Sequence, residues 1–375
     1  MTISARLEFS HKYSFNSPIR GTFKLTVVPE MLSVASGFHY IILLDTSGSM
    51  RGEKIETAKR GAIELLNRIP QGNKVTLITF SSYVNTLFEF EERKDLVIEN
   101  IQRIYAKGYT AFHTALTTAV QIAKKYNVPG YFILLTDGRP TDRKDIQAYE
   151  MLDFPREFKV IAYGIGYDYE ERFLKIIADK TGGIFIHIQD PKEIINSLPQ
   201  AAVTKIGAKD VVIDIDAPSS IRLLNYPGPP VILNAIDKTV TIYGETTIPA
   251  RFNGNALVVT ISYVNPLDNL KKNITLQAQV YPATDTQMFL SGINNEINNE
   301  YQYYELMNKL ADQVNSENLI EATKTLNQMQ QIAQQTKRVD LIETTRKLQQ
   351  SIGSTRNVEQ TRKTIMSEVT KKMRS

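Results

Sequence analysis

The sequence predicts a doubly wound α/β domain that is inserted into an antiparallel β-sandwich and followed by a C-terminal helical region. Three observations lead to this prediction. Between residues 38 and 200, short apolar runs alternate with segments of helical periodicity. Strand-like segments of alternating polarity flank this stretch on both sides. After Pro282 proline disappears, and apolar residues follow helical spacing. With 375 residues, the chain is long enough for two or three domains.

The central stretch contains five apolar runs with the length of strands. They are FHYIILLD at 38–45, KVTLITFS at 74–81, YFILLTDG at 131–138, KVIAYGIG at 159–166 and IFIHI at 184–188. Amphipathic segments lie between them, such as KIETAKRGAIELLNRI, in which Ile55, Ala58 and Leu65 share one stripe. Continuous apolar strands separated by helices predict a parallel sheet buried on both faces. The segment VNTLFEFEE at 84–92 follows a short Ser-Tyr turn and is expected to be the antiparallel edge strand.

The flanking strands are expected to form one sandwich. Residues 3–28 and 209–281 both alternate polar and apolar side chains with period two. An N-terminal hairpin alone is too small to bury its apolar face, so we expect it to pair with strands after residue 203. The predicted parts are the N-terminal sandwich strands at 1–36, the α/β domain at 37–202, the remaining sandwich at 203–285, a helical region at 286–352 and a basic, flexible tail at 353–375.

The helical region is predicted in three segments, at about 287–314, 317–335 and 338–352. We expect a small hairpin or bundle packed on the body, and a long polar helix for partner docking is the alternative. In the tail, Val358, Ile365, Val369 and Met373 have a modest apolar spacing, which is compatible with a terminal helix or with no stable structure.

Composition and charge exclude several functional classes. The chain has no Cys, so it can form neither disulfides nor thiolate metal sites. It shows no signal peptide and no membrane-spanning run, and we expect it to be cytoplasmic and without membrane contact. The net charge of +4 comes entirely from the last 23 residues, which carry six basic and two acidic side chains. A neutral body with a basic tail predicts no direct nucleic-acid binding.

Carboxylates and hydroxyls gather where two predicted central strands end. Asp45, Ser47 and Ser49 follow the first strand, Asp137 follows YFILLTDG, and Thr110 lies in a loop before a helix. In an open α/β sheet, ligands bind beyond the carboxyl ends of the strands. All five side chains offer oxygen, which suits a hard divalent cation, with Mg²⁺ expected first and Mn²⁺ or Ca²⁺ as alternatives.

The hydroxyls are weak ligands, so a position is expected to remain for water or for an Asp, Glu or phosphate of a partner. A simpler interpretation is that Ser47 or Ser49 caps the helix that starts near Gly52. The presence of Thr110 and Asp137 in matching loops favours the metal site over capping alone.

These residues carry a resemblance to a known family. Asp45-Thr46-Ser47-Gly48-Ser49, Thr110 in GYT and Asp137 in LLTDG resemble the metal-ion-dependent adhesion site (MIDAS) of von Willebrand factor A (vWA) domains. The resemblance covers about residues 38–200. It implies that the five residues are metal ligands, with the two aspartates acting partly through water. Tyr109 departs from the second Gly of many intracellular members and is expected to shape the rim.

The whole layout is similar to the vWA proteins of thermoacidophilic archaea, which include a repressor of the archaellum. This resemblance implies repression of motility genes, phosphorylation by a Ser/Thr protein kinase and removal by a phosphatase. It also implies docking to a forkhead-associated (FHA) domain that reads phosphothreonine. The candidate acceptors in the tail are Ser354, Thr355, Thr361, Thr364, Ser367, Thr370 and Ser375.

Two other functions compete with a non-enzymatic interaction protein. A phosphatase of the haloacid dehalogenase type needs a second Asp two residues after the first, where this chain has Ser47. The few histidines and the absence of a G-x-S-x-G elbow also disfavour a hydrolase. An adaptor or chaperone subunit for an AAA+ ATPase is the second alternative, because the chain has no nucleotide-binding loop of its own.

Overall fold

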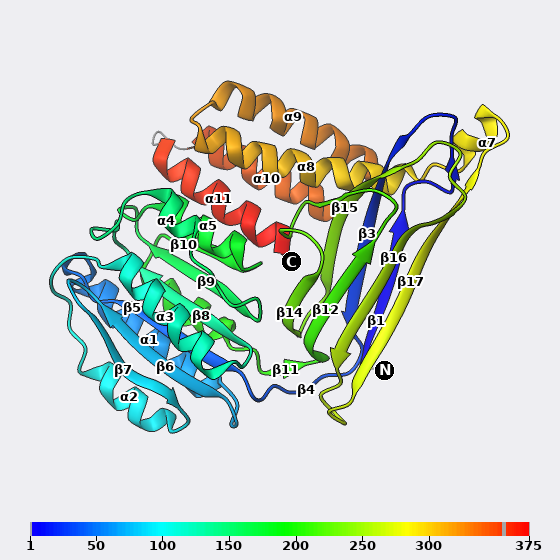
Figure 1. The fold of residues 1–375 in the computed structure, drawn as a ribbon. Coiled ribbons are helices and arrows are strands. Elements are labelled where there is room, and N and C mark those ends of the chain that lie inside the picture. The colour runs from blue at the N-terminus through cyan, green and yellow to red at the C-terminus, as the bar shows by residue number, and fades with distance from the viewer. Residues whose placement is uncertain (1, 355–357, 375) are drawn as a thin grey trace. The chain divides into compact units, whose positions relative to one another are not determined.

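The computed structural model describes residues 2–354 and 358–374. The chain divides into two compact units, coloured by residue number in Figure 1. The first unit contains Met1–Met31, Gly207–Ile232 and Lys238–Ser375, and the second contains Leu32–Ile206 and Leu233–Asp237. The α/β unit is therefore inserted into the chain of the other unit, which confirms the predicted fold class.

The second unit is built on a six-stranded sheet in the order β10-β9-β8-β5-β6-β7 (Figure 1). Its parallel strands are β5 (His39–Asp45), β6 (Lys74–Phe80), β8 (Gly130–Thr136), β9 (Phe158–Ile165) and β10 (Ile184–Ile188). At one edge, β7 (Val84–Glu91) pairs with β6 in the antiparallel direction, as predicted. A two-residue pairing of β4 (Ser33–Val34) with β11 (Lys205–Ile206) lies where the chain enters and leaves this unit.

Strand β5 is buried along its whole length because helices cover both faces of the sheet. Tyr40, Ile42 and Leu44 pack in one cluster with Ile55 and Leu65 of α1 (Glu53–Arg68). Helix α3 (Phe112–Tyr126) contacts β5 and β6, and α5 (Glu171–Lys180) contacts β9 and β10. The remaining helical elements of this unit are η1 (Gly48–Met50), α2 (Lys94–Gln102), α4 (Ile146–Glu150), α6 (Glu193–Ser197) and η2 (Leu198–Ala201).

The first unit contains two sheets of alternating burial. One has the order β1-β3-β15-β13, with β1 at Ile3–Phe9, β3 at Ile19–Pro29, β15 at Val240–Ile248 and β13 at Ile221–Leu223. The other has the order β14-β12-β16-β17-β2, with β12 at Ala208–Asp216, β16 at Gly254–Val264, β17 at Lys271–Pro282 and β2 at Tyr13–Ser14. Strand β14 (Val231–Ile236) begins in this unit, and its residues from Leu233 onward are assigned to the second. Strand β3 pairs with β15 from Ile19↔Ile248 to Val27↔Val240. The N-terminal hairpin thus completes its sheet with a strand that follows the inserted unit.

The C-terminal helices of this unit form a bundle rather than one long docking helix. They are α7 (Thr286–Ser291), α8 (Asn295–Asn315), α9 (Leu319–Thr336), α10 (Val339–Ser354) and α11 (Val358–Arg374). Contacts join α8 to α9, α9 to α10, and α11 to both α8 and α10, and α8 also contacts β3. Among the described residues, no helix is both long and apolar enough to span a membrane.

The structure corrects two expectations about this region. The helix predicted at 287–314 is broken, because Ile293 forms a bridge with His11, and Gly292 and Asn294 hydrogen-bond the backbone next to it. The Asn294 side chain then caps α8. We expected a flexible tail from residue 353, but residues 358–374 form α11, in which Ile365, Met366 and Val369 are buried. The i, i+1, i+4 spacing of these apolar residues explains the helix.

A buried carboxylate ties α8 to the sheet of the first unit. Glu300 is 1% exposed and accepts hydrogen bonds from Arg338 Nη1 at 2.6 Å and from the Tyr243 hydroxyl at 3.0 Å. Lys24 Nζ of β3 lies 2.8 Å from Oε2 of Glu300, the oxygen that also accepts from Tyr243. The Glu300 carboxylate therefore connects α8, two strands and the start of α10. The two cations compensate its negative charge, which is buried away from water.

Replacing Glu300 with alanine should lower the free energy of unfolding by about 3 kcal/mol, because Lys24 and Arg338 lose their shared buried partner. Hydrogen exchange of the α8 amides in a urea series measures the loss. The matched control is Glu321→Ala, which removes only an exposed pair with Lys324 and should change stability by less than about 1 kcal/mol. Equal effects of the two variants would contradict the role given to Glu300.

The six-stranded sheet should lose stability in mild acid because of His39. Its ring is buried at the start of β5, with Nε2 2.7 Å from Thr76 Oγ1, and burial lowers its pKa from 6.5 to about 4, against a smaller opposite effect of Glu89. The folded state thus favours neutral His39, so this stability is complete above pH 6.5 and is lost as the pH falls toward 4. Between pH 8 and pH 5 we expect a loss of about 2 kcal/mol in the protection of the β5 amides. His39→Gln, which cannot take up this proton, should flatten the dependence, and an unchanged slope would refute the assignment.

Candidate functional site

The candidate site lies at the carboxyl ends of β5 and β8, which are hydrogen-bonded neighbours in the sheet. Asp45 is the last residue of β5, and Asp137 directly follows β8. Both side chains are fully buried. Their proximity results from the parallel register, which pairs Leu44 with Leu135 and so ends both strands at the same level.

The loop after β5 turns its hydroxyls toward Asp137. The Ser47 backbone N–H donates to Asp45 Oδ1 at 2.8 Å, which tightens the first turn of the loop. Ser47 Oγ and Ser49 Oγ are 3.0 Å apart, and Ser49 Oγ donates to Asp137 Oδ1 at 2.7 Å. Neither Ser47 nor Ser49 caps α1, because Gly52 is its N-cap and no side chain caps that end.

Thr110 reaches the same place from the loop between α2 and α3. That loop is fastened to the first one by backbone hydrogen bonds from Gly48 N to Gly108 O at 2.9 Å and from Lys107 N to Thr46 O at 2.7 Å. A Cβ atom built on Gly138 would lie 2.9 Å from Thr110 Oγ1 and 3.4 Å from Asp45 Oδ2. The Thr110 hydroxyl therefore lies beside both strand ends, and Gly138 keeps the space between them open.

The two carboxylates differ in how their charge is balanced. Burial raises the pKa of Asp45 to about 7, while hydrogen bonds from Thr136 and Ser47 oppose this shift and the charge of Asp137 adds to it. The Thr136 hydroxyl donates to Asp45 Oδ2 at 2.5 Å. Asp137 instead forms an ion pair with Lys54, whose Nζ lies 2.5 Å from Oδ2. A hydroxyl and a backbone N–H satisfy one carboxylate, and an ammonium satisfies the other.

Sequence reasoning missed Thr136 and Lys54. Thr136 directly precedes Asp137 in the LLTDG segment, but a threonine at the end of an apolar strand has no distinguishing pattern. Lys54 stands in the first turn of α1, where a basic side chain is expected to be exposed to solvent. Because β5 pairs with β8, Thr136 contacts Asp45 and Lys54 contacts Asp137.

The donor set fits a hard divalent cation. Hydroxyls of Ser47, Ser49 and Thr110 and the carboxylates of Asp45 and Asp137 converge from three loops, and hard cations prefer such oxygen ligands. Over the part of the chain that the structure describes, no group of three or more His, Asp or Glu side chains is placed to hold a metal ion.

The rim of the site carries exposed aromatic and basic side chains. Tyr83, Tyr105 and Tyr109 are 78%, 65% and 71% exposed, and they lie on the two loops that adjoin Thr110. These loops touch, since the Tyr109 N–H donates to Ser82 Oγ at 3.0 Å. Lys107 Nζ stands 4.9 Å from the centre of the Tyr105 ring. Tyrosine is enriched in surfaces that bind other proteins.

The histidines are placed elsewhere or engaged in packing. His39 is at the opposite end of β5 from Asp45, and the His113 ring packs edge-on against Tyr149 with centroids 5.2 Å apart. His187 Nδ1 is 2.6 Å from the Tyr169 hydroxyl. Ser47, where a phosphatase would have its second acid, uses its backbone N–H to hold Asp45.

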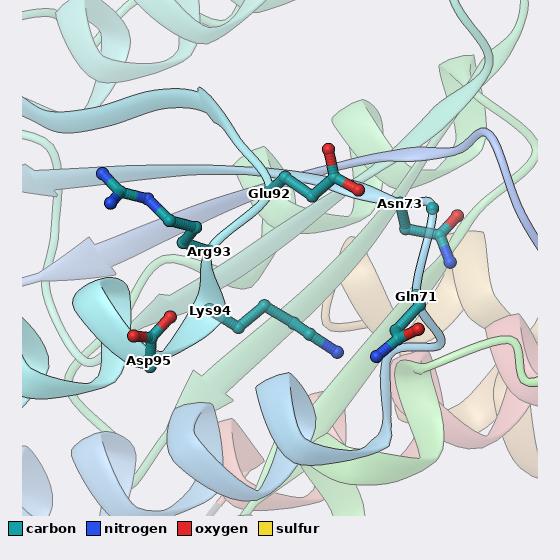
Figure 2. A pocket seen from close by; sticks show the side chains of 7 residues that line it. Gln71, Asn73, Glu92, Arg93, Lys94 and Asp95 are labelled. Atoms are coloured by element: carbon teal, nitrogen blue, oxygen red, sulfur yellow. The ribbon is translucent and has the colours of Figure 1, made fainter.

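A cavity of about 450 Å³ opens at the amino end of β6 (Figure 2). Several side chains that line it are engaged in the local structure. Lys94 donates to the carbonyl oxygen of Ile69, and Glu92 is paired with Lys74 at 2.7 Å. Asn73 receives the Phe38 N–H and donates to two carbonyls. Figure 2 shows these groups on separate sides of the opening, and they stabilise chain turns rather than converge on a ligand.

Two family models match the chain. The von Willebrand factor type A domain matches residues 41–200, and the archaellum regulatory network B (ArnB) C-terminal domain matches residues 295–375. An uncharacterised protein of Synechocystis is 24% identical over 212 residues, which are 54% of this chain and 50% of that protein. The chain thus spans about half the length of this curated relative.

Solved structures extend the likeness to the whole chain. A von Willebrand factor type A protein from Catenulispora acidiphila shares the fold, with a TM-score of 0.69, 18% identity and coverage of 92% of this chain and 89% of that chain. The ArnB paralog VWA2 from Sulfolobus acidocaldarius has a TM-score of 0.86 and 31% identity, over 100% of this chain and 98% of that chain. The chain therefore belongs to the ArnB family of von Willebrand factor A proteins.

Proposed function

We propose that this chain is a non-enzymatic regulatory protein that acts by protein–protein interaction through a Mg²⁺-binding vWA domain and a phosphorylated C-terminal region. The observation that carries the proposal is the convergence of five oxygen-bearing side chains at one end of the sheet, in a chain with an ArnB C-terminal domain. Mn²⁺ and Ca²⁺ are the alternative ions. The five side chains are Asp45, Ser47, Ser49, Thr110 and Asp137.

Ser47, Ser49 and Thr110 would hold the cation through their hydroxyls, and Asp45 and Asp137 would hold it directly or through water. A dication there supplies a Lewis-acidic position for an oxygen atom of a partner protein. Within the chain, Thr136 fixes one oxygen of Asp45 by its 2.5 Å hydrogen bond, and Ser47 N fixes the other. The hydroxyls are weak ligands, so an acidic side chain of the partner completes the site.

A binding role accounts for the surroundings of the site better than catalysis does. No described histidine lies among the five side chains, and Ser47 replaces the acid that a phosphatase would use. The exposed Tyr83, Tyr105 and Tyr109 offer a contact surface around the position that an acidic partner would occupy. Enzymes of the phosphatase or hydrolase class remain the least supported alternative.

The packing of α11 limits which of the candidate acceptors a kinase could reach. Thr364 is partly exposed, whereas Ser367 and Thr370 are buried and Thr370 Oγ1 donates to Met366 O at 2.9 Å. Thr355 and Ser375 lie outside the described residues. A kinase could therefore reach Thr364 on folded α11, but it could reach Thr370 only after the helix unpacks. The proposed reader is an FHA protein, with a Ser/Thr kinase and phosphatase setting the phosphate, and the regulated output is repression of motility genes.

An adaptor or chaperone subunit for an AAA+ ATPase is the second proposal. The exposed tyrosine rim would equally serve an ATPase partner. Mass spectrometry of a native pull-down separates the two, since co-purification of an ATPase without an FHA protein would favour the adaptor.

Mg²⁺ titrated into the EDTA-treated full chain should bind with a measurable heat. Asp45→Ala and Asp137→Ala should each weaken binding about a hundredfold or more, because each removes half of the anionic charge of the site. The control is Asp153→Ala, an aspartate of the same unit that is 85% exposed and pairs with Lys124. Circular dichroism shows whether each variant is folded. Binding by both site variants equal to that of the control would refute the metal site.

Substitutions in α11 test the tail more sharply than truncation, because deleting 353–375 would remove a packed helix. After treatment with a Ser/Thr kinase, Thr364→Val should reduce binding to an FHA domain at least tenfold, measured by surface plasmon resonance. Thr370→Val is the matched control and should keep the affinity, because its hydroxyl is buried in folded α11. Loss of binding in Thr370→Val alone would contradict this assignment.

A further inference from the structure

Lys54 lies beside the candidate metal site without belonging to its oxygen donors. It stands in the first turn of α1, and its side chain is 24% exposed. Its ammonium is 2.5 Å from Asp137 Oδ2, while the other oxygen of Asp137 receives the Ser49 hydroxyl at 2.7 Å. Asp137 is thus shared between a cation on one side and the hydroxyls of the donor set on the other.

The end of the Lys54 side chain passes the backbone that follows β9. A Cβ atom built on Gly166 would lie 3.7 Å from both Cε and Nζ of Lys54, which is an ordinary contact distance. The lysine stem is therefore flanked by this turn, and its ammonium ends in the ion pair with Asp137.

The charges determine what this contact does. A buried carboxylate without a counter-charge is strongly unfavourable, and the ammonium removes that penalty for Asp137. Asp45 has only neutral donors, namely the Thr136 hydroxyl and the Ser47 N–H. With Lys54 in place, the two carboxylates carry one uncompensated negative charge. A dication that enters the site meets a unit positive charge next to it, and the loaded site has a net charge of +1 rather than zero.

We infer that Lys54 is an internal counter-ion that occupies the metal-facing carboxylate in the metal-free protein and sets the affinity of the site for divalent cations. The inference rests on the proposed metal site and adds a property to it. Lys54 keeps Asp137 in position without metal, weakens the binding of the ion through charge repulsion, and leaves an excess positive charge that draws in an acidic group of the partner. Arg51 and Lys107, both exposed on the adjoining loops, have the same sign.

The test uses the full chain, stripped with EDTA, and inorganic Mg²⁺ as the probe. Lys54→Met keeps the length of the side chain and removes its charge, and we expect it to bind Mg²⁺ at least tenfold more tightly than the wild type in calorimetry. Lys54→Arg keeps the charge and should stay within threefold of the wild type. The control is Lys59→Met on the same helix, whose lysine pairs with Glu56 at 3.0 Å and with Ile104 O at 3.2 Å, and it should leave the affinity unchanged.

A second measurement, the thermal unfolding midpoint, does not depend on the affinity. In EDTA, Lys54→Met should unfold at a lower temperature than the wild type, because Asp137 has lost its counter-charge. Saturating Mg²⁺ should abolish this difference, because the bound ion replaces the missing positive charge. Wild-type binding of Mg²⁺ with equal or weaker binding by folded Lys54→Met would overturn the inference and leave the metal site standing. Absence of Mg²⁺ binding in both proteins would overturn both.

Discussion

The structure of the vWA unit depends on keeping two negative charges together inside it. Asp45 and Asp137 end two neighbouring parallel strands, and both are withdrawn from water. Such a pair is tolerated only if each carboxylate has donors or a cation. The chain supplies them from four residues, which are the Ser47 N–H, the Ser49 and Thr136 hydroxyls and the Lys54 ammonium. The conformation of three loops follows from this requirement.

The same principle organises the other unit at a different position. Glu300 is buried and is matched by Lys24, Arg338 and the Tyr243 hydroxyl, which come from a strand, a helix start and a second strand. Its role is structural, because Arg338 contacts one of its oxygens and Lys24 and Tyr243 contact the other. At Asp137, by contrast, the Lys54 ammonium contacts one carboxylate oxygen and the Ser49 hydroxyl contacts the other. We propose that this buried acid is a binding group, whereas Glu300 is a packing element.

The prediction of the inserted architecture succeeded because its signals are local and repeated. Five apolar runs with intervening stripes required a parallel sheet, and the polarity of VNTLFEFEE identified the edge strand β7. The predicted helix at 287–314 failed where the N-terminal segment pairs with it, since His11 and Ile293 are 282 positions apart and no local pattern encodes their bridge. The prediction of a flexible tail was wrong for the opposite reason. The apolar residues of α11 are too few to stabilise an isolated helix, and they are buried only because α8 and α10 contact it.

The sequence by itself determined the types and the order of the five candidate oxygen ligands, because the local pattern dictates the form of the segments that carry them. These residues are Asp45, Ser47, Ser49, Thr110 and Asp137. Tertiary structure decided which charges accompany them. Lys54 and Thr136 reach the site only because β5 and β8 are paired in one register and α1 begins beside their ends. Electrostatic balance depends on distances of a few ångströms between residues far apart in the chain, such as the 83 positions between Lys54 and Asp137. A linear pattern does not contain those distances, and the fold sets them.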